Sequence, residues 1–365
     1  MRATTWRHFD FWLLGTVAML TIFGITMISS TISGNIEMAN AARRQLIFAV
    51  IGFAVLIAVA SIDYHLWSSI NRPLYIITIA ALAILNVVAA AVFGSARWFT
   101  TTIVSIQPSE FAKIVIILVM AEFFAQNRDR IGDMKIVIRS LLLTLGLVVW
   151  IILQPNLSTS IVIFVVWFAL LWASGLKIKH LLLFIAAGAV LPVVSFPFLV
   201  DYQKKRIMNF ISPDPSARHG DIYNIQQALI SIGSGGWFGQ GYGHGSQVQL
   251  RFLKVRWSDY IFSSMAEEFG FIGILIVMLI LIFVIYRCLR AARLARDTFG
   301  ALICYGVAVL VAFQTMVNIG VNLKLLPATG LPLPFISYGG SSLLSMLIGI
   351  GLVESVILRH KSLEF

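Results

Sequence analysis

Charged side chains are scarce in this sequence. Only 12% of its 365 residues are Asp, Glu, Lys or Arg, whereas 59% are hydrophobic, and the mean hydropathy is +0.91. An ordinary soluble domain has a charged fraction of about 25%. The composition therefore excludes a soluble globular domain and indicates a polytopic membrane protein.

Cysteine is nearly absent, and so are the common catalytic motifs. Cys288 and Cys304 are the only two cysteines and lie in or beside apolar stretches, so they cannot form a disulfide framework or a metal cluster. We interpret both as packing residues. The sequence contains no Walker loop, no GxSxG elbow and no dinucleotide fingerprint, which removes the usual ATPase, hydrolase and dehydrogenase functions.

Long apolar stretches are what the sequence has instead. Stretches of about 17–25 residues can span ~30 Å of hydrocarbon, and we find ten of them. They lie near residues 11–30, 45–62, 74–93, 110–126, 136–154, 158–175, 178–200, 262–286, 300–322 and 340–358. We therefore predict an all-α integral membrane protein with ten transmembrane helices, forming a single domain over residues 1–365. The first stretch follows no small-residue cleavage site, so we expect a retained helix rather than a removed signal.

The positions of Lys and Arg predict the orientation. An even number of helices places both termini on one side, and with that side inside the cell 15 of the 27 Lys and Arg residues are cytoplasmic. Many of them lie in short loops such as "YRCLRAARLARD", and short loops are the ones that orient a membrane protein. We expect both termini to be cytoplasmic.

The connection between predicted helices seven and eight, about residues 201–258, is the only long one. It holds seven of the twelve outward-facing cations and the glycine-rich stretch "GSGGWFGQGYGHGS" (233–246). Long loops in compact folds are usually functional or disordered, and the aromatic and leucine residues here argue against disorder. We predict a large, folded extracytoplasmic loop.

The segment "RWFTTTIVSIQPSEFAK" (97–113) leads into the fourth apolar stretch. Pro108 suits the first turn of a helix, and Glu110 and Lys113 share a helix face at i, i+3. One interpretation is a capped helix with an internal ion pair. The other is a phosphate site formed by Arg97 and Lys113, because both supply charge-assisted hydrogen bonds to phosphate oxygens.

The segment "NIGVNLKLLPATGLPLPFISYGGSSLL" (318–344) has three prolines within eight residues, which forbid a continuous helix. Irregular backbone near the membrane is tolerated where it lines a polar cavity or is buried in protein. The run "SYGGSS" (337–342) then opens the last helix, where free N–H groups can hold an anion. Ser337 and Ser341 are candidate ligands there; small residues chosen for close helix packing are the alternative.

Three carboxylates stand at the mouth of a hydrophobic span in "VRWSDYIFSSMAEEFGFIGILIVMLILIF" (255–283). Such positions are energetically expensive and usually functional. Asp259 should lie at the outer water–lipid boundary, as a reactive carboxylate or as a helix N-cap. Glu267 and Glu268 lie deeper, and we expect them to serve as a structural ion pair or a backbone clamp.

Six segments spread in order over nearly the whole chain resemble one known family. They are "QPSEFAK" (107–113), "QPNLSTS" (154–160), "IGSGGWFGQGYGHGSQ" (232–247), "SDYIF" (258–262), "EEFGFIG" (267–273) and "LLPATGLPLPFISYGGSS" (325–342). They are similar to motifs of the SEDS family of shape, elongation, division and sporulation proteins, and the proline-rich motif looks more like that of its elongation members. The resemblance implies ten transmembrane helices with a large outer loop between the seventh and eighth. "QPNLSTS" departs from the usual "QPDLGT", which puts in doubt any role for a carboxylate at position 156.

The activity that the resemblance implies is peptidoglycan glycosyltransfer from lipid II, with inversion at the reacting carbon. The 4-hydroxyl of the acceptor's N-acetylglucosamine attacks the anomeric carbon of the donor's N-acetylmuramic acid, and polyprenyl pyrophosphate leaves. Asp259 is then the candidate general base, because a positioned carboxylate accelerates such a step ~10²–10⁴-fold. The leaving pyrophosphate needs preorganised cations, for which the candidates are Arg97, Lys113, Lys205 and Arg206.

The resemblance also implies the ligands and partners. Lipid II is the expected substrate, a class B penicillin-binding protein that supplies transpeptidase activity is the expected partner, and no nucleic acid is expected. No ligand cluster demands a metal, so no metal site is predicted, while a divalent cation such as Mg²⁺ at the pyrophosphate stays open. A lipid II flippase, a non-catalytic scaffold and a division or sporulation role are the alternatives. We expect a multi-pass protein of the bacterial cytoplasmic membrane.

Overall fold

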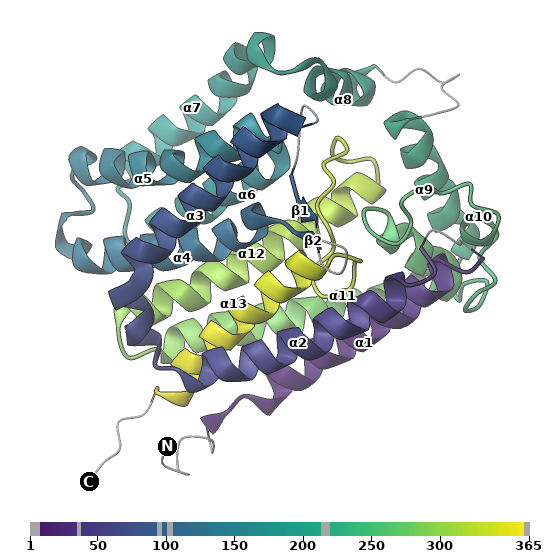
Figure 1. Ribbon diagram of the computed structural model, residues 1–365, viewed down its shortest axis with the longest axis horizontal. Helices are drawn as coiled ribbons and strands as arrows, with labels where there is room; N and C mark the ends of the chain where they lie inside the picture. The colour runs from purple at the N-terminus through teal and green to yellow at the C-terminus, as the bar shows by residue number, and fades with distance from the viewer. Residues whose placement is uncertain (1–7, 35–37, 93–96, 101–104, 213–219, 361–365) are drawn as a thin grey trace.

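The computed structural model describes residues 8–34, 38–92, 97–100, 105–212 and 220–360. They form a bundle of long helices that lie side by side (Figure 1). The long helices are α1 (Phe11–Thr31), α2 (Ala41–Ser61), α3 (Tyr64–Val92), α4 (Pro108–Gln126), α5 (Met134–Leu153), α6 (Leu157–Ala173), α7 (Ile178–Ser195), α11 (Ile261–Leu294), α12 (Thr298–Asn322) and α13 (Gly340–Leu358). Each predicted apolar stretch falls on one of these helices, and the all-helical fold class is confirmed.

Seven of the helices are long and apolar enough to cross a membrane, namely α1, α2, α3, α5, α11, α12 and α13. Helices α4, α6 and α7 run beside them (Figure 1). Helix α6 has 17 residues, and α4 carries Glu110, Lys113 and Glu122. The chain is thus a multi-pass membrane protein, and the count of ten crossings stays a prediction.

Irregular segments and short helices lie at the end of the bundle opposite the start of α1 and the end of α13 (Figure 1). The predicted long connection contains α8 (Asp201–Ile211), α9 (Asp221–Gly235) and α10 (Ser246–Gln249). Before α4, two strands that were not expected, β1 (Phe99–Thr100) and β2 (Ser105–Ile106), pair antiparallel. Single turns of 3₁₀-helix are η2 (Arg128–Arg130) and η3 (Phe196–Phe198).

Helices α4, α12 and α13 form the centre of the bundle. Helix α13 packs along α2, α4 and α12, and α4 also contacts α3 and α6. Where lipid is the solvent, close backbone approach stabilises helix pairs and small residues permit it. At Gly351 an added Cβ would lie 2.8 Å from the Leu56 carbonyl oxygen of α2, so a larger side chain at this position would push α2 and α13 apart.

Helix α11 begins within one residue of the predicted stretch but extends beyond its predicted end. The segment "YRCLRAARLARD" was expected to be a loop, but it is helical as far as Leu294. Only residues 295–297 connect α11 to α12. The expectation was wrong because arginines at a helix end extend their charged groups to water while their stems stay on the helix, so the charge did not mark a chain break.

Helix α11 is also interrupted at Gly270, which has φ 67° and ψ −169°. An added Cβ there would lie 2.3 Å from the backbone nitrogen of Gly239. Glycine is required on both grounds, since a left-handed φ and backbone contact each exclude a side chain. The break seats the glycine-rich stretch directly on α11, where the amides of Gln240 and Gly241 donate to the carbonyls of Glu267 (2.9 Å) and Glu268 (3.0 Å).

The C-terminal end of α1 is held by residues that follow it by more than 200 positions. The hydroxyl of Tyr242 donates to the Thr26 carbonyl at 2.9 Å. Arg256 Nε donates to the Thr31 carbonyl at 2.6 Å. The Arg256 bond satisfies the carbonyl of the last residue of α1, which a helix leaves unpaired, and both bonds fix the long connection against α1.

Candidate active site

Asp259 lies in the turn that leads into α11, and two asparagines of α12 hold its backbone. The Nδ2 atoms of Asn318 and Asn322 donate to the Asp259 carbonyl at 3.1 and 3.0 Å. The asparagines are four residues apart, so they share one face of α12, and both are buried. The position of Asp259 is therefore set through its main chain, independently of its carboxylate.

Asn322 also stabilises the start of α11. Its Oδ1 accepts from the Ser263 backbone N–H at 3.2 Å and from the Ser263 hydroxyl at 2.6 Å. The first amides of a helix lack intrahelical partners, so a side chain of α12 caps α11. Tyr260, the N-cap residue itself, makes no side-chain cap bond. Asp259 does not cap this helix, and the alternative role that we had considered for it is not what the structure shows.

The Asp259 carboxylate is left with few partners. Ser258 Oγ donates to its Oδ1 at 2.9 Å, and no other hydrogen bond to this carboxylate occurs within the described part of the chain. Burial raises the pKa of Asp259 above its usual range, while the Ser258 hydrogen bond and the charge of Arg206 oppose that rise. Its Oδ2 lies beside Gly330, where an added Cβ would be 3.5 Å away.

Arg206 of α8 is the predicted cation whose charge reaches Asp259. It forms an ion pair with Asp221 at 3.2 Å and donates to the Ala328 carbonyl at 3.2 Å. It thereby joins α8, the start of α9 and the proline-rich segment. Lys205, its neighbour on α8, is exposed.

Ser337 supports the turn that carries Asp259. Its hydroxyl donates to the Ser258 carbonyl at 2.8 Å and accepts from the Leu333 amide at 2.8 Å. The next residue, Tyr338, donates its amide to the Trp257 carbonyl at 2.9 Å. The later part of the proline-rich segment, residues 331–337, is thus mostly buried in the protein and forms one wall of the site, a place where irregular backbone in a membrane protein is tolerated.

Ser341 lies in the first turn of α13, which begins at Gly340 as predicted. Its hydroxyl accepts from the Gln107 amide at 3.0 Å and donates to the Ser105 carbonyl at 3.2 Å. These bonds tie α13 to β2 and to the start of α4. The predicted anion-binding role of Ser341 remains a prediction, since this hydroxyl is already used within the protein.

Glu110 and Lys113 form the internal ion pair that one interpretation predicted. The Nζ of Lys113 lies 2.7 Å from Glu110 Oε2, and the Lys113 side chain is 0% exposed. Helix α4 begins at Pro108, as predicted. The ammonium group is therefore enclosed in the protein, away from any ligand that stays in solvent.

Arg97 lies against the turn between α5 and α6. Its Nε and one terminal nitrogen donate to the carbonyls of Gln154 (3.1 Å) and Pro155 (2.8 Å). These bonds make the guanidinium a brace between two segments, and its predicted phosphate contact remains a prediction.

Glu267 and Glu268 hold the glycine-rich stretch in place. Glu267 accepts from the amides of Gln247 (2.8 Å) and Val248 (3.2 Å) and from the Ser246 hydroxyl (3.2 Å), all at the start of α10. Glu268 accepts from the Ser30 hydroxyl of α1. A carboxylate at a helix start is favourable, so Glu267 acts as a backbone clamp.

The described residues contain no group of three or more His, Cys, Asp or Glu side chains that could hold a metal ion. The negative charges of Asp259 and Asp221 act on each other, but the positive charge of Arg206 lies beside both of them. A metal held by the protein does not fit this arrangement. A divalent cation brought by the pyrophosphate itself stays an open proposal, and no chemical step is derived from it.

The sequence predictions missed Asn318, Asn322 and Ser258 as parts of the site. A signal was present for the two asparagines, because polar residues within an apolar span are costly and face the interior of the bundle. Nothing local to the sequence identifies the Asp259 carbonyl as their partner.

Comparison with known proteins identifies the family. The FtsW, RodA and SpoVE family model, described as "Cell cycle protein", matches residues 9–362. The chain belongs to the SEDS family. Among relatives of this SEDS protein, "Probable peptidoglycan glycosyltransferase FtsW" of Trichlorobacter lovleyi is 34% identical, covering 96% of this chain and 93% of that protein. "Peptidoglycan glycosyltransferase MrdB" of Escherichia coli K12 is also 34% identical, covering 98% and 95%.

Solved structures of SEDS proteins have the same fold. A chain of a peptidoglycan synthase complex, described as showing structural coordination of polymerization and crosslinking, matches with TM-score 0.80 and 28% identity, covering 96% of this chain and 98% of that one. The rod shape determining protein RodA of Thermus thermophilus matches with TM-score 0.70 and 27% identity, covering 96% of each chain.

Proposed function

We propose that this SEDS protein polymerises lipid II into glycan strands at the outer face of the bacterial cytoplasmic membrane. The observation that carries the proposal is the Asp259 carboxylate, which has a raised pKa and few partners and whose backbone two buried asparagines hold. Relatives named peptidoglycan glycosyltransferases support the reaction class. Both termini lie in the cytoplasm in this proposal, which places α8, α9, α10 and Asp259 outside.

In the proposed reaction, Asp259 accepts the proton of the acceptor's 4-hydroxyl as that oxygen bonds to the donor's anomeric carbon. Polyprenyl pyrophosphate leaves with the electron pair of the broken bond, and direct displacement converts the α-linkage into a β-linkage. A base works best when its pKa lies near the operating pH, and burial moves the pKa of Asp259 in that direction. Pyrophosphate is a good leaving group and needs charge stabilisation rather than a paired acid.

Arg206 and Lys205 are the cations that we assign first to the pyrophosphate. Both lie on α8, and Arg206 already acts on Asp259 electrostatically. Arg97 and Lys113 follow, because neither is among the charges that act on Asp259. The enclosed ion pair of Lys113 with Glu110 favours a structural role for Lys113. On the sequence alone, Arg97 and Lys113 rank before Lys205 and Arg206.

We propose elongation as the cellular role, and a class B penicillin-binding protein as the partner. Identity alone does not decide between elongation and division, since the FtsW and MrdB relatives named above are equally identical. The motif "PATGLPLPF" and the likeness to RodA favour elongation. The likeness to a chain of a synthase complex that polymerises and crosslinks supports a crosslinking partner.

The test is Asp259→Asn, which removes the base but keeps the size and the contacts of the residue, because the asparagines bind the backbone. Purified variant, with its partner's transpeptidase blocked by a β-lactam, should bind lipid II and polymerise it ~10²–10⁴-fold more slowly than wild type. Asp259→Glu should recover little, since it displaces the carboxylate by about a methylene. Asp201→Asn, an exposed carboxylate on α8, is the matched control and should leave the rate unchanged.

Three results would overturn the proposal. Long glycan strands made by Asp259→Asn would show that this carboxylate is not the base. A wild-type protein that makes no polymer but moves lipid II across vesicles would be a flippase, and one that does neither would be a scaffold for its partner.

A further inference from the structure

A cavity of about 960 Å³ lies at the end of the bundle where α11 ends and α12 begins. Its walls come from these two helices, from η2 and the residue after it, and from the connection between α6 and α7. Asp259 precedes the start of α11, whereas the cavity lies around the end of that helix. The short helices α8 to α10 lie at the other end of the bundle from the α11–α12 connection (Figure 1). No residue of the candidate active site lines it, so the proposed function leaves it unexplained.

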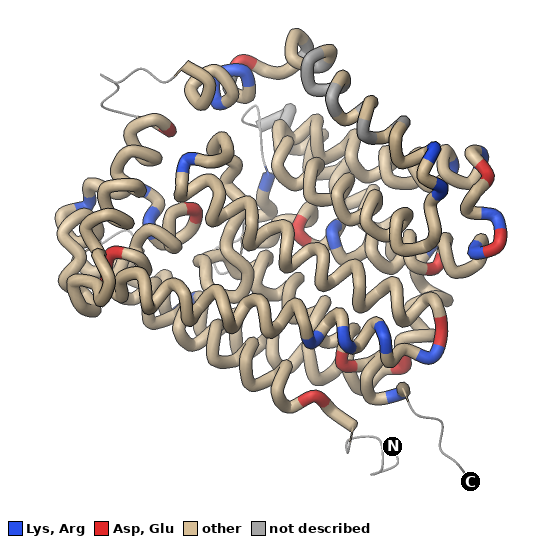
Figure 2. Tube along the Cα trace, turned by 180° about the vertical axis from the view of Figure 1, so that it is seen from behind, with Lys and Arg blue, Asp and Glu red and all other residues tan. Residues whose placement is uncertain are grey.

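Three arginines line this cavity: Arg128 of η2 and Arg293 and Arg296 around the end of α11. All three are exposed, and within the described residues none has a carboxylate at ion-pair distance. Arg128 donates to the Thr298 hydroxyl at 3.3 Å. Figure 2 shows that Lys and Arg gather at the ends of the bundle, but these three converge on one hollow from separate elements.

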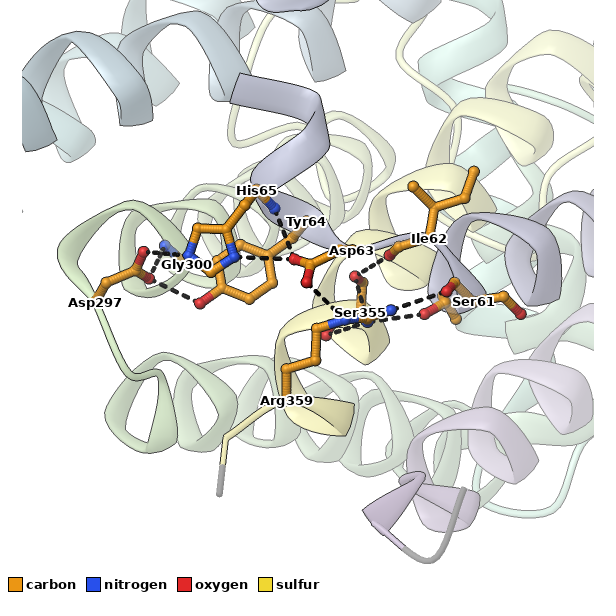
Figure 3. Close-up of polar contacts among 10 residues, drawn as sticks. Ser61, Ile62, Asp63, Tyr64, His65, Asp297, Gly300, Ser355 and Arg359 are labelled. Atoms are coloured by element: carbon orange, nitrogen blue, oxygen red, sulfur yellow. Dashed lines mark hydrogen bonds and ion pairs between the residues drawn. The ribbon is translucent and has the colours of Figure 1, made fainter. Parts of the chain in front are cut away.

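Among the described residues, Asp297 is the one acid that lines the cavity, and Tyr64, His65 and Gly300 contact its carboxylate (Figure 3). Its Oδ1 accepts from the Tyr64 hydroxyl at 3.0 Å and from the Gly300 amide at 2.9 Å. Its Oδ2 lies 3.0 Å from His65 Nε2. The arginines therefore outnumber the acid, and the cavity keeps a positive charge.

Part of the remaining wall is apolar. Leu289, Ala292, Leu302 and the partly buried Tyr305 line it. A small, fully hydrated anion gains nothing from an apolar wall. A lipid headgroup is joined to a glycerol and acyl chains, and these can pack against such a wall.

The cavity lies at headgroup depth if the helices cross a membrane. It lies where apolar helices end, and Trp172 and Leu294, next to its lining residues in sequence, expose large apolar side chains. Tryptophan is typical of the membrane interface. Basic pockets between transmembrane helices bind anionic headgroups, and the volume is at the upper end of ligand pockets, which run from about 300 to 1,000 Å³.

We propose that this cavity binds an anionic phospholipid. The phosphate lies among Arg128, Arg293 and Arg296, and the start of the acyl chains lies along Leu289 and Tyr305. The lipid connects the end of α11 to η2 and to the α6–α7 connection, three segments that the cavity separates.

The experiment uses the whole protein in phosphatidylcholine nanodiscs that contain a minority of phosphatidylglycerol. Native mass spectrometry after mild extraction counts the retained lipids, and a thermal melt in each lipid gives the stabilisation. Wild type should retain phosphatidylglycerol in preference to phosphatidylcholine and melt at a higher temperature with it. Arg293→Gln combined with Arg296→Gln should weaken this binding roughly a hundredfold, about tenfold for each charge-assisted hydrogen bond lost.

Two further variants separate a built site from diffuse charge. Arg128→Gln changes a different wall and should also weaken binding, about tenfold. Arg130→Gln removes an exposed arginine of the same turn that does not line the cavity, and it should bind like wild type. Melting temperatures in pure phosphatidylcholine should stay equal among all variants, which shows that each is folded.

Three results would overturn the proposal. The first is retention of phosphatidylglycerol by the double variant at the wild-type level. The second is an equal loss in Arg130→Gln, which would indicate general surface charge. The third is full stabilisation of the wild type by inorganic phosphate in pure phosphatidylcholine, which would make free phosphate, and not a lipid, the ligand.

Discussion

Truncation of Asn322 to alanine tests how the Asp259 turn is held. The amide group of Asn322 makes four hydrogen bonds: Nδ2 to the carbonyls of Asp259 and Asn318, and Oδ1 to the N–H and hydroxyl of Ser263. A buried hydrogen bond contributes about 1 kcal/mol net, and a buried group left without a partner costs about 1–3 kcal/mol. The Asp259 carbonyl keeps Asn318 as a donor, but the Ser263 amide at the start of α11 loses its acceptor. We therefore expect a loss of about 2–4 kcal/mol in the free energy of unfolding.

The same change should reduce catalysis by more than unfolding explains. A reacting group displaced by about 1 Å loses rate up to ~10²-fold, so polymerisation per folded Asn322→Ala molecule should fall about 10–100-fold. The assay is lipid II polymerisation at a fixed amount of folded protein, measured together with a thermal melt. KM should change little, because Asn322 is buried and makes its contacts within the protein.

Asn86→Ala is the matched control. Its Nδ2 donates to the carbonyls of Leu82 and Trp150, both at 3.0 Å, and it lies between α3 and α5, away from Asp259. It is partly buried and makes two such bonds rather than four, so it should lose less stability, about 1–2 kcal/mol, and keep the wild-type rate per folded molecule. Wild-type polymerisation by folded Asn322→Ala, or an equal loss of rate in Asn86→Ala, would refute the positioning role.

Two further predictions concern buried charge. Folding raises the pKa of Asp259, so the folded chain binds more protons than the unfolded one. The stability contributed by this carboxyl is therefore present below the unfolded pKa of about 4 and is lost as the pH rises through the folded pKa. Asp259→Asn should raise Tm at pH 7 and give no gain below about pH 4; an unchanged Tm at pH 7 would contradict the burial. Lys113→Ala leaves Glu110 buried without its partner and should lower the free energy of unfolding by about 3–5 kcal/mol. Lys113→Met combined with Glu110→Gln should recover most of the stability and the activity. A double variant that folds but is inactive would instead assign Lys113 to the substrate.

The sequence predicts the helices well because a segment that crosses lipid must be a long apolar helix that satisfies its own backbone hydrogen bonds. Every predicted apolar stretch corresponds to a helix, and α13 begins and ends at the predicted residues. The end of α11 was missed because arginine at a helix end and arginine in a loop give the same composition. The break at Gly270 was missed because a glycine within an apolar run is common in membrane helices, and its contact with Gly239 depends on tertiary structure.

The candidate site was predicted in part. Asp259 could be singled out because a carboxylate at the mouth of a span requires an explanation. The sequence did not show what the other candidate site residues contact. The spacing of Glu110 and Lys113 allows both an ion pair and a ligand site, and only the burial of Lys113 separates them. Pairing between α12 and the Asp259 turn is a long-range contact, which no local pattern encodes.

The contacts at the end of α1 set an order of assembly. Helix α1 is the first to be synthesised, yet Arg256 pairs the carbonyl of its last residue, Thr31, and Tyr242 binds the Thr26 carbonyl earlier in the helix. More than 200 residues must be made before that end of the helix can be completed, and contacts so distant in sequence form late in folding. The Asp259 turn should therefore take its final form only after most of the bundle is in the membrane. A chain that ends before α12 would carry the carboxylate without the two asparagines that hold its backbone.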